Sequence, residues 1–234
     1  MPPDAKTPAD EASLAGHRAR LRERFLTGGP DALLDYELLE MVLYAALPRG
    51  DTKALAKRLL AAFDDSFAAV VAADPERLKQ VRGVGDATVA AIKTVDAAAG
   101  RLLRGRAKGR SVLSSWQAVT DYCRATMGLR STEQFRILFL DRRNQLIADE
   151  DQQRGTVDHT PVYPREVVKR ALEIGASAII LVHNHPSGDL TPSRADIEMT
   201  RLVKEAAGAL GITIHDHVIV GSNGYASFKA LGLL

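Results

Sequence analysis

Residues 178–196 read AIILVHNHPSGDLTPSRAD, and this stretch predicts how the second half of the chain folds. It begins with a continuous run of apolar and mostly β-branched residues, which is typical of a strand buried on both faces. After a turn, Thr191 and Pro192 are typical of the start of a helix, with threonine as the N-cap and proline in the first helical position. We therefore expect a buried strand, a turn and a helix.

Two histidines stand at the end of this strand, at positions 183 and 185. Because side chains two residues apart in a strand point to the same face, the imidazoles of His183 and His185 should lie together. Asp196 should lie in the first turns of the following helix, folded back toward the histidines. Two imidazoles and a carboxylate are ligands of a catalytic zinc ion, which keeps a fourth position for water. Many histidine pairs at strand ends bind no metal, so the prediction depends on the full spacing.

This spacing resembles a known motif. His183-x-His185, followed after seven residues by Ser193-x-x-Asp196, is similar to the JAMM (MPN-plus) metallohydrolase motif. The residues between these positions resemble the RadC family in particular: Asn184, Pro186, Ser187, Gly188 and Pro192. The resemblance implies one Zn²⁺ per chain, held by His183, His185 and Asp196.

The resemblance also implies a general base. In the JAMM pattern a glutamate opens the first strand after the first helix of the domain, and Glu133 occupies that place. Such a carboxylate deprotonates the attacking water and delivers the proton to the leaving group. Glu150 and Glu166 are the alternatives. Glu150 lies in the charged stretch 149–151, which is typical of a solvated surface, and Glu166 lies in a first helical turn, where the helix dipole accounts for it.

Ser193 matches the serine of the motif. By resemblance, its hydroxyl would donate a hydrogen bond to the oxyanion that forms on the attacked carbonyl. The alternative is helix capping, which either Ser193 or Thr191 could provide. We take Ser193 as a candidate catalytic residue.

A second His-x-His, residues 215–217, is not expected to bind its own metal, because no carboxylate side chain follows it in residues 221–234. We expect Asp216 and His217 to support the first site or the fold. Asp189 and His159 are predicted to be surface groups.

The elements around these motifs predict a mixed sheet domain over residues 113–234. A helix is expected over 115–127, a hairpin of two antiparallel strands around 142–145, and a helix from Pro164 to Gly175. Further strands are expected at 212–220 and 225–228. Strands that alternate with helices indicate an α/β or α+β fold. The resemblance implies a JAMM/MPN-like domain, similar to cytidine deaminase, with helices that flank the sheet.

The first half of the chain predicts a different architecture. Residues 1–14 lack periodicity and are predicted to be a disordered tail. Residues 15–104 carry apolar side chains at three- and four-residue steps, which indicates a small all-α domain. Residues 105–112, with two glycines and three cations, are predicted to form a basic linker.

Residues 78–92 resemble a helix-hairpin-helix motif. Gly83 and Gly85 would permit a tight turn and let backbone N–H groups approach a phosphate, and Lys93 adds a cation. Asp86 departs from the pattern, because a cation there would favour DNA. The motif therefore gives three candidate DNA-binding residues, Gly83, Gly85 and Lys93. A helix connection that serves only packing or a protein contact is the alternative.

Composition limits the class of protein. The 234 residues carry a net charge of +2, which does not demand a nucleic-acid partner. No apolar run reaches the roughly 18–20 residues that span a bilayer, and the N-terminal residues lack a secretory signal. We expect a cytoplasmic protein without a membrane partner. The single cysteine, Cys123, cannot form an internal disulfide and is predicted to be a buried thiol without chemistry.

Three functions follow. The first is zinc-dependent hydrolysis of an amide, in an isopeptide or a peptide, with a peptide or protein substrate. The second is a DNA-repair or recombination accessory protein, whose helical domain binds DNA and whose metal domain is a nuclease or a docking module. Zinc nucleases commonly use two or more metals and the motif supplies ligands for one, which favours the first. The third is an assembly module with a structural zinc.

Overall fold

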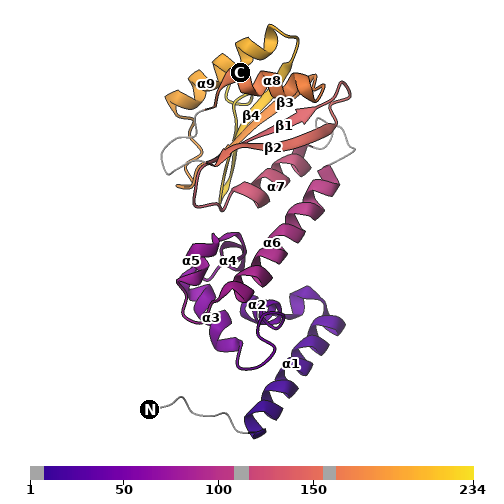
Figure 1. Cartoon of the computed structure of the whole chain (residues 1–234), viewed down its shortest axis with the longest axis vertical. Coiled ribbons are helices and arrows are strands. Elements are labelled where there is room, and N and C mark those ends of the chain that lie inside the picture. Colours follow the sequence, from indigo (N-terminus) through magenta and orange to yellow (C-terminus); the bar gives the residue numbers. More distant parts are fainter. Residues whose placement is uncertain (1–7, 108–115, 155–161) are drawn as a thin grey trace. The chain divides into compact units, whose positions relative to one another are not determined.

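Figure 1 shows the computed structural model, which describes residues 8–107, 116–154 and 162–234. The chain divides into two compact units, Met1–Ala98 and Ala99–Leu234, and each is described by itself. Within the described ranges, no helix combines the length and the apolar character of a membrane span.

The described residues of the first unit form helices. These are α1 (Pro8–Gly28), the short 3₁₀ helix η1 (Pro30–Ala32), α2 (Asp35–Leu43), α3 (Lys53–Ala62), α4 (Phe67–Ala72), α5 (Pro75–Lys79) and the first part of α6 (Asp86–Ala107). Their apolar faces meet in one core, built around residues such as Leu39, Leu59, Val70, Leu78 and Ile92. The helical periodicity of the sequence therefore corresponds to helices that share a core.

Two boundaries differ from the sequence prediction. The helix α1 begins at Pro8, so part of the predicted disordered tail is helical, because Ala, Glu and Leu favour a helix even without an apolar stripe. Residues 1–7 lie outside the described part of the chain. The helix α6 continues to Ala107, past the predicted start of the linker at residue 105, and residues 108–115 are again outside the described ranges.

The last turns of α6 belong to the second unit. Leu103 packs against the core of this unit, and the Arg104 Nη2 atom lies 3.2 Å from Asp149 Oδ2. The units accordingly divide between Ala98 and Ala99, inside α6, and not at the predicted linker of residues 105–112. Gly105 alone did not end α6. A glycine in a helix interior costs about 1 kcal/mol, which is small beside the contacts of Leu103 and Arg104.

The second unit is built on a five-stranded mixed sheet. Its elements are α7 (Trp116–Met127), β1 (Gln134–Leu140), β2 (Leu146–Arg154), α8 (Pro164–Glu173), β3 (Ala178–Asn184), α9 (Arg194–Gly208), β4 (Thr213–Gly221) and β5 (Gly224–Ser227). The strand order is β2-β1-β3-β4-β5, and only β3 and β4 are parallel. The predicted hairpin of β1 and β2 and the helices α7 and α8 are confirmed.

Helices cover both faces of this sheet (Figure 1). The α7 face carries the even-numbered side chains of β1 and β3, such as Leu138 and Ile180, which pack with Val119 and Met127 of α7. The opposite face carries the odd-numbered side chains, which pack with α8 and α9: Ile137, Phe139, Ile179 and Leu181. Every residue of β3 is buried, so its apolar sequence is explained by a central position.

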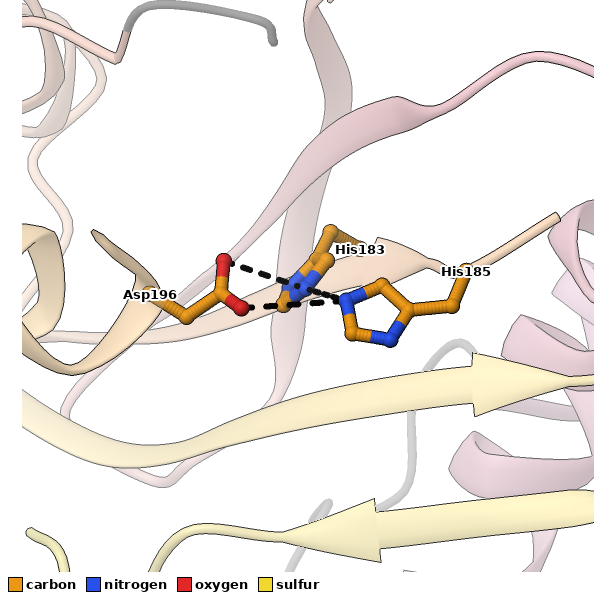
Figure 2. A group of neighbouring side chains, drawn as sticks. All are labelled: His183, His185 and Asp196. Carbon is orange, nitrogen blue, oxygen red and sulfur yellow. Dashed lines mark hydrogen bonds and ion pairs between the residues drawn. The ribbon is translucent and has the colours of Figure 1, made fainter. Parts of the chain in front are cut away.

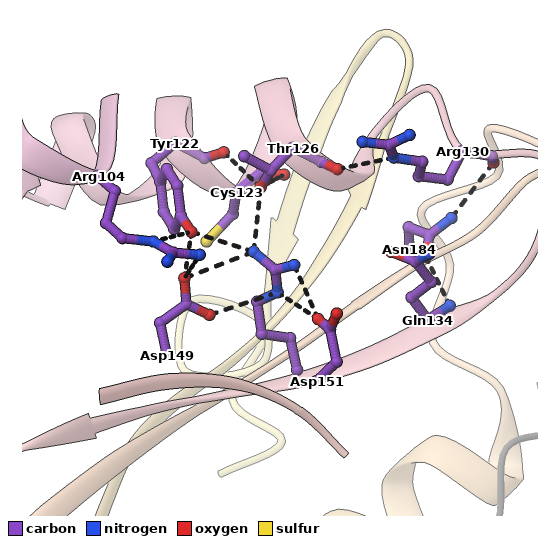
Figure 3. A network of polar contacts seen from close by, with 10 residues as sticks. Arg104, Tyr122, Cys123, Thr126, Arg130, Gln134, Asp149, Asp151 and Asn184 are labelled. Atoms are coloured by element: carbon purple, nitrogen blue, oxygen red, sulfur yellow. Dashed lines mark hydrogen bonds and ion pairs between the residues drawn. The ribbon is translucent and has the colours of Figure 1, made fainter. Parts of the chain in front are cut away.

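A buried ionic network lies on the α7 face (Figure 3). The Arg136 guanidinium contacts Asp151 Oδ1 at 2.7 Å and Asp149 Oδ1 at 3.4 Å, and the Tyr122 hydroxyl also donates to Asp149. The prediction that residues 149–151 form a solvated surface was therefore wrong for Asp149, whose side chain is only 3% exposed. Sequence could not show this, because the compensating cation comes from the neighbouring strand.

Cys123 is buried beside this network. Burial raises the pKa of its thiol to about 12, which keeps it protonated and unreactive. The structure supports the prediction of a structural thiol.

Replacement of Arg136 by methionine should destabilise the second unit strongly. It leaves the buried Asp149 with only the half-exposed Arg104 as a cation and removes the partner of Asp151, and loss of one member of a buried ion pair costs about 3 kcal/mol or more. The measurement is urea unfolding followed by the fluorescence of Trp116, the only tryptophan of the chain. The control is Arg201→Met, which removes solvent-screened pairs with Glu198 and Glu205 and should change stability little. Equal losses would contradict the buried network as a source of stability.

Candidate metal centre

Three polar side chains converge at one end of β3 (Figure 2). His183 is the penultimate residue of β3, His185 directly follows the strand, and Asp196 lies in the first turn of α9. The Nε2 atoms of the two histidines are 2.9 Å apart. Asp196 Oδ1 lies 3.3 Å from His183 Nε2, and Asp196 Oδ2 lies 3.7 Å from His185 Nε2. The structure thus brings together the three predicted ligands.

These separations fit a tetrahedral zinc ion. Two ligand atoms at about 2.0–2.1 Å from zinc, at the tetrahedral angle, are about 3.3 Å apart. The three observed separations of 2.9, 3.3 and 3.7 Å scatter around this value. Among the described residues, no other group of three histidine, cysteine or acidic side chains meets in this way. The arrangement can hold one ion with three protein ligands.

A chain of hydrogen bonds fixes the tautomer of His183. The Thr200 hydroxyl donates to the Asp196 carbonyl oxygen at 2.6 Å, so it must accept from His217 Nδ1, also at 2.6 Å. Burial holds the pKa of His217 well below its ordinary value, so the ring is neutral and its Nε2 is an acceptor. His183 Nδ1 must then donate to that atom, at 2.7 Å. This leaves the lone pair of His183 Nε2 directed at the proposed position of the zinc ion.

The same result holds for His185. Its Nδ1 atom donates to the Asp189 carbonyl oxygen at 2.5 Å, which leaves the lone pair on Nε2. Gly188, with φ of +80°, turns the chain so that this carbonyl reaches the ring. Asp189 is exposed, as predicted, and its backbone carbonyl also orients the His185 ring. Two lone pairs that face each other at 2.9 Å repel, and a cation between them would bind both.

Charge at the site also suits a cation. Burial alone would raise the pKa of the Asp196 carboxyl, but its contacts with the His183 and His185 rings and its hydrogen bond from Ser193 outweigh burial and hold this pKa far below its usual range. The carboxylate is therefore ionised at neutral pH, as a metal ligand must be. The Asp196 carboxylate raises the pKa of His185, because it favours a positive charge at Nε2, where a proton and a metal ion compete; burial opposes this, and the charge of Glu133 adds a smaller increase. Glu133 is thus within electrostatic reach of His185.

The register of the sheet places Glu133 beside the histidines. Phe135 of β1 pairs with His183 of β3, so the same antiparallel register, extended by two residues, brings Glu133 level with His185. Glu133 also has the odd parity of the side chains on the His183 face. It is half-buried, and within the described ranges its carboxylate makes no hydrogen bond or ion pair. A base that must accept a proton from water needs such a free carboxylate.

The two alternative glutamates are engaged elsewhere. Glu150 accepts hydrogen bonds from Arg170 at 2.6 and 2.8 Å, which lower the pKa of its carboxyl. Glu166 is exposed in the first turn of α8 and pairs with Arg165 at 3.1 Å. The structure therefore favours Glu133.

Ser193 is the N-cap of α9. Its Oγ accepts from the Asp196 backbone N–H at 3.1 Å and donates to Asp196 Oδ2 at 2.6 Å, while its own N–H donates to Oδ2 at 2.8 Å. The prediction of Thr191 as N-cap was wrong, because this reciprocal capping box begins the helix at Arg194. The contacts of Ser193 support the capping alternative and orient a metal ligand. Oxyanion stabilisation by its hydroxyl stays a prediction.

The second His-x-His makes three separate contacts. His215 Nε2 lies 2.6 Å from Asn144 Oδ1, the Asp216 carboxylate accepts from the Lys229 N–H at 3.0 Å, and His217 supports His183. This agrees with the prediction of a supporting role. The predicted surface position of His159 lies outside the described residues.

The three candidate DNA-binding residues differ in their surroundings: the two glycines suit a tight turn, whereas the ammonium group of Lys93 already has partners. Gly83 has φ of +94°, a left-handed conformation that favours glycine, and Gly85 precedes α6 with open space around its Cα atom. Lys93 instead donates to the carbonyl oxygens of Val71 and Ala73, at 2.8 and 3.1 Å, and pairs with Asp96. Its ammonium group serves packing within the first unit. DNA contact through these residues stays a prediction.

Elemental analysis should find one zinc ion per chain, and His185→Ala should lose it because one of three ligands is removed. His215→Ala is the matched control, since its ring binds Asn144 and no ligand, and it should keep the ion. Wild-type protein without zinc, under conditions that retain weakly bound metal, would contradict the proposed site.

Replacement of His217 by phenylalanine should weaken zinc binding by about 10- to 100-fold, as is typical when the hydrogen-bond partner of a ligand is removed. Phenylalanine fills the buried volume between Phe135 and Phe228 but cannot accept from His183 Nδ1. The measurement is competition with a chelating zinc indicator, with His215→Phe as the control. Unchanged affinity in His217→Phe would show that the hydrogen-bond chain does not tune the ligand.

This chain is similar to known proteins over most of its length. Residues 113–233 match the model of the RadC-like JAB domain, and residues 15–90 match that of the UPF0758 N-terminal domain. A UPF0758 protein of Rhodobacter capsulatus is 64% identical over 92% of this chain and all of its own length. A UPF0758 protein of Ruegeria pomeroyi is 59% identical over 93% of this chain and 97% of its own length. The chain therefore belongs to the RadC-like UPF0758 family, and its second unit is a JAB domain.

Proposed function

We propose that this protein is a zinc-dependent hydrolase that cleaves amide bonds, in a peptide or an isopeptide. The observation that carries the proposal is the position of Glu133. The β1–β3 register, extended by two residues, brings Glu133 level with His185, and the charge of Glu133 raises the pKa of His185. The three neighbouring donor atoms have separations that fit a single zinc ion. A structural metal site has no need of such a carboxylate.

A bound zinc ion would polarise the substrate carbonyl and make water easier to deprotonate. His183, His185 and Asp196 would hold the ion, and the hydrogen bonds of His217 and Asp189 keep the two rings in the tautomers that this requires. Glu133 would take the proton from the attacking water. It would then deliver that proton to the leaving nitrogen, which cannot depart as an anion.

The ligand set supports hydrolysis of amides over cleavage of a nucleic-acid backbone. Zinc nucleases commonly clamp a phosphate between two ions about 3.5–4 Å apart. The side chains of the described residues supply ligands for one ion. A peptide or protein is therefore the proposed substrate.

A second function, DNA binding by the first unit, is favoured by the turn at Gly83. This turn leads directly into the N-terminus of α6, where free backbone N–H groups suit a phosphate. Lys93 does not support it, because its ammonium group is engaged. If this binding occurs through phosphates, the affinity of the full chain for duplex DNA should fall steeply with salt. Affinity that ignores salt would contradict it.

The test of hydrolysis is Glu133→Gln. The amide cannot act as a base, so turnover of peptide and isopeptide substrates by the zinc-loaded protein should fall by about 10²- to 10⁴-fold while zinc content stays at one per chain. Glu166→Gln is the control, since that exposed side chain pairs with Arg165, and it should keep full turnover. Full turnover in Glu133→Gln would exclude the proposed base. Unchanged behaviour in every assay would favour a structural zinc.

A further inference from the structure

Asn184 lies between the two histidine ligands, and its side chain is fully buried. As an even-numbered residue of β3 it points to the α7 face, away from His183. Its Oδ1 atom accepts from the Gln134 N–H at 2.8 Å. Its Nδ2 atom donates to the carbonyl oxygens of Thr132 at 3.1 Å and Arg130 at 3.4 Å (Figure 3).

Two of these partners are the peptide groups on either side of Glu133. The Thr132 carbonyl belongs to the peptide bond that precedes Glu133, and the Gln134 N–H belongs to the one that follows it. One carboxamide therefore holds both peptide planes that set the direction of the Glu133 side chain. A side chain attached to a backbone that is fixed on both sides has only its own rotamers left.

The carboxamide replaces backbone pairing at the point where that pairing ends. The β1–β3 ladder runs from Leu140 and Ala178 to Phe135 and His183, and Glu133 lies beyond it. The His185 N–H donates to the Val220 carbonyl of β4 at 3.1 Å and so continues the pairing of β3 with β4. The side chain of Asn184 is what continues to tie the β1 segment to β3.

The chemistry of these contacts requires an amide of this length. The site presents one N–H and two carbonyl oxygens, so it needs an acceptor and a donor held apart on one planar group. Aspartate lacks the donor hydrogens, and serine or threonine is too short to bridge both peptide groups. Only one orientation of the Asn184 amide satisfies all three partners.

We propose that Asn184 is a positioning residue that fixes Glu133 relative to His183 and His185. This inference rests on the proposed function of Glu133 as the base. It gives a reason for asparagine between the two histidines: the same strand presents ligands on one face and aligns the base from the other. The metal-binding strand and the base-bearing segment then move as one unit.

The first test measures the hydrogen bond itself in the full chain without metal. Asn184→Ala should speed hydrogen exchange of the Gln134 amide by tenfold or more, about 1.4 kcal/mol, because its acceptor is gone. Ser177→Ala is the control. It removes a hydrogen bond to Leu140 at the other end of the same strand pair and should leave Gln134 unchanged. Unchanged exchange in Asn184→Ala would overturn the proposal.

The second test measures the effect on Glu133 without any substrate. Co²⁺ in place of zinc gives a visible absorption spectrum that senses groups around the ion. Glu133→Gln should change this spectrum, Asn184→Ala should change it in the same direction, and the double variant should match Glu133→Gln alone. A spectrum that Asn184→Ala leaves as in the wild type, or additive changes, would overturn the positioning role whether or not a substrate is found.

Asn184→Thr provides the same tests if alanine at this buried position prevents folding, because a β-branched residue favours a strand but cannot bridge both peptides. Once a peptide that the wild-type protein hydrolyses is known, Asn184→Ala or Asn184→Thr should lower kcat at least tenfold and leave KM and zinc content unchanged. Loss of turnover in Glu133→Gln with normal turnover in the Asn184 variants would leave the proposed function standing and overturn this inference alone.

Discussion

The central strand β3 is buried on both faces, and this constraint shapes everything around the site. Because side chains alternate across a strand, its last residues must direct polar groups into two packed layers at once. His183 enters the layer beneath α9, and Asn184 enters the layer beneath α7. Each buried polar atom there must find a partner, since an unsatisfied one costs about 1–3 kcal/mol. The partners that satisfy these atoms are the same groups that build the site.

The two layers meet this demand in different ways. On the α9 side, neutral groups form a directed chain from His183 through His217 and Thr200 to the Asp196 carbonyl. Its direction is fixed at one end, because a carbonyl can only accept. On the α7 side, a charged network surrounds Arg136 and two aspartates. The neutral chain selects a tautomer, while the charged network joins β2 to β1, the strand that follows Glu133.

The site is therefore arranged before any ion binds. In their neutral form both imidazoles present lone pairs, Asp196 is ionised and held by the capping box of α9, and the backbone on both sides of Glu133 is hydrogen bonded. An arrangement of this kind lowers the reorganisation that binding and catalysis require. It supports hydrolysis over a purely structural metal, for which a half-buried glutamate beside the histidines and a backbone clamp would have no use. The glycine turn of the first unit stands as a separate proposal.

The sequence by itself determined the elements of the second unit and the identity of three side chains that converge as candidate metal ligands. Local patterns can be read from the sequence without knowledge of the fold. They include the apolar run of β3, the capping signals of α8 and α9, and the hairpin residues. The His-x-His spacing likewise fixes two side chains on one face. Residue choice alone did not separate Ser193 from Thr191 as the N-cap of α9, because both side chains can accept a hydrogen bond from a backbone N–H. Helix α1 begins inside the predicted tail, because helix propensity needs no apolar stripe.

Only the tertiary structure decided how distant residues pair. The burial of Asp149 depends on Arg136 from the adjacent strand, the tautomer of His183 on His217 from β4, and the orientation of His185 on the backbone of Asp189. The role of Asn184 had no signal in the sequence, because its partners are backbone atoms that any residue would supply. The physical reason is the same in each case: a hydrogen bond joins atoms by distance in space, and strand order and register set that distance.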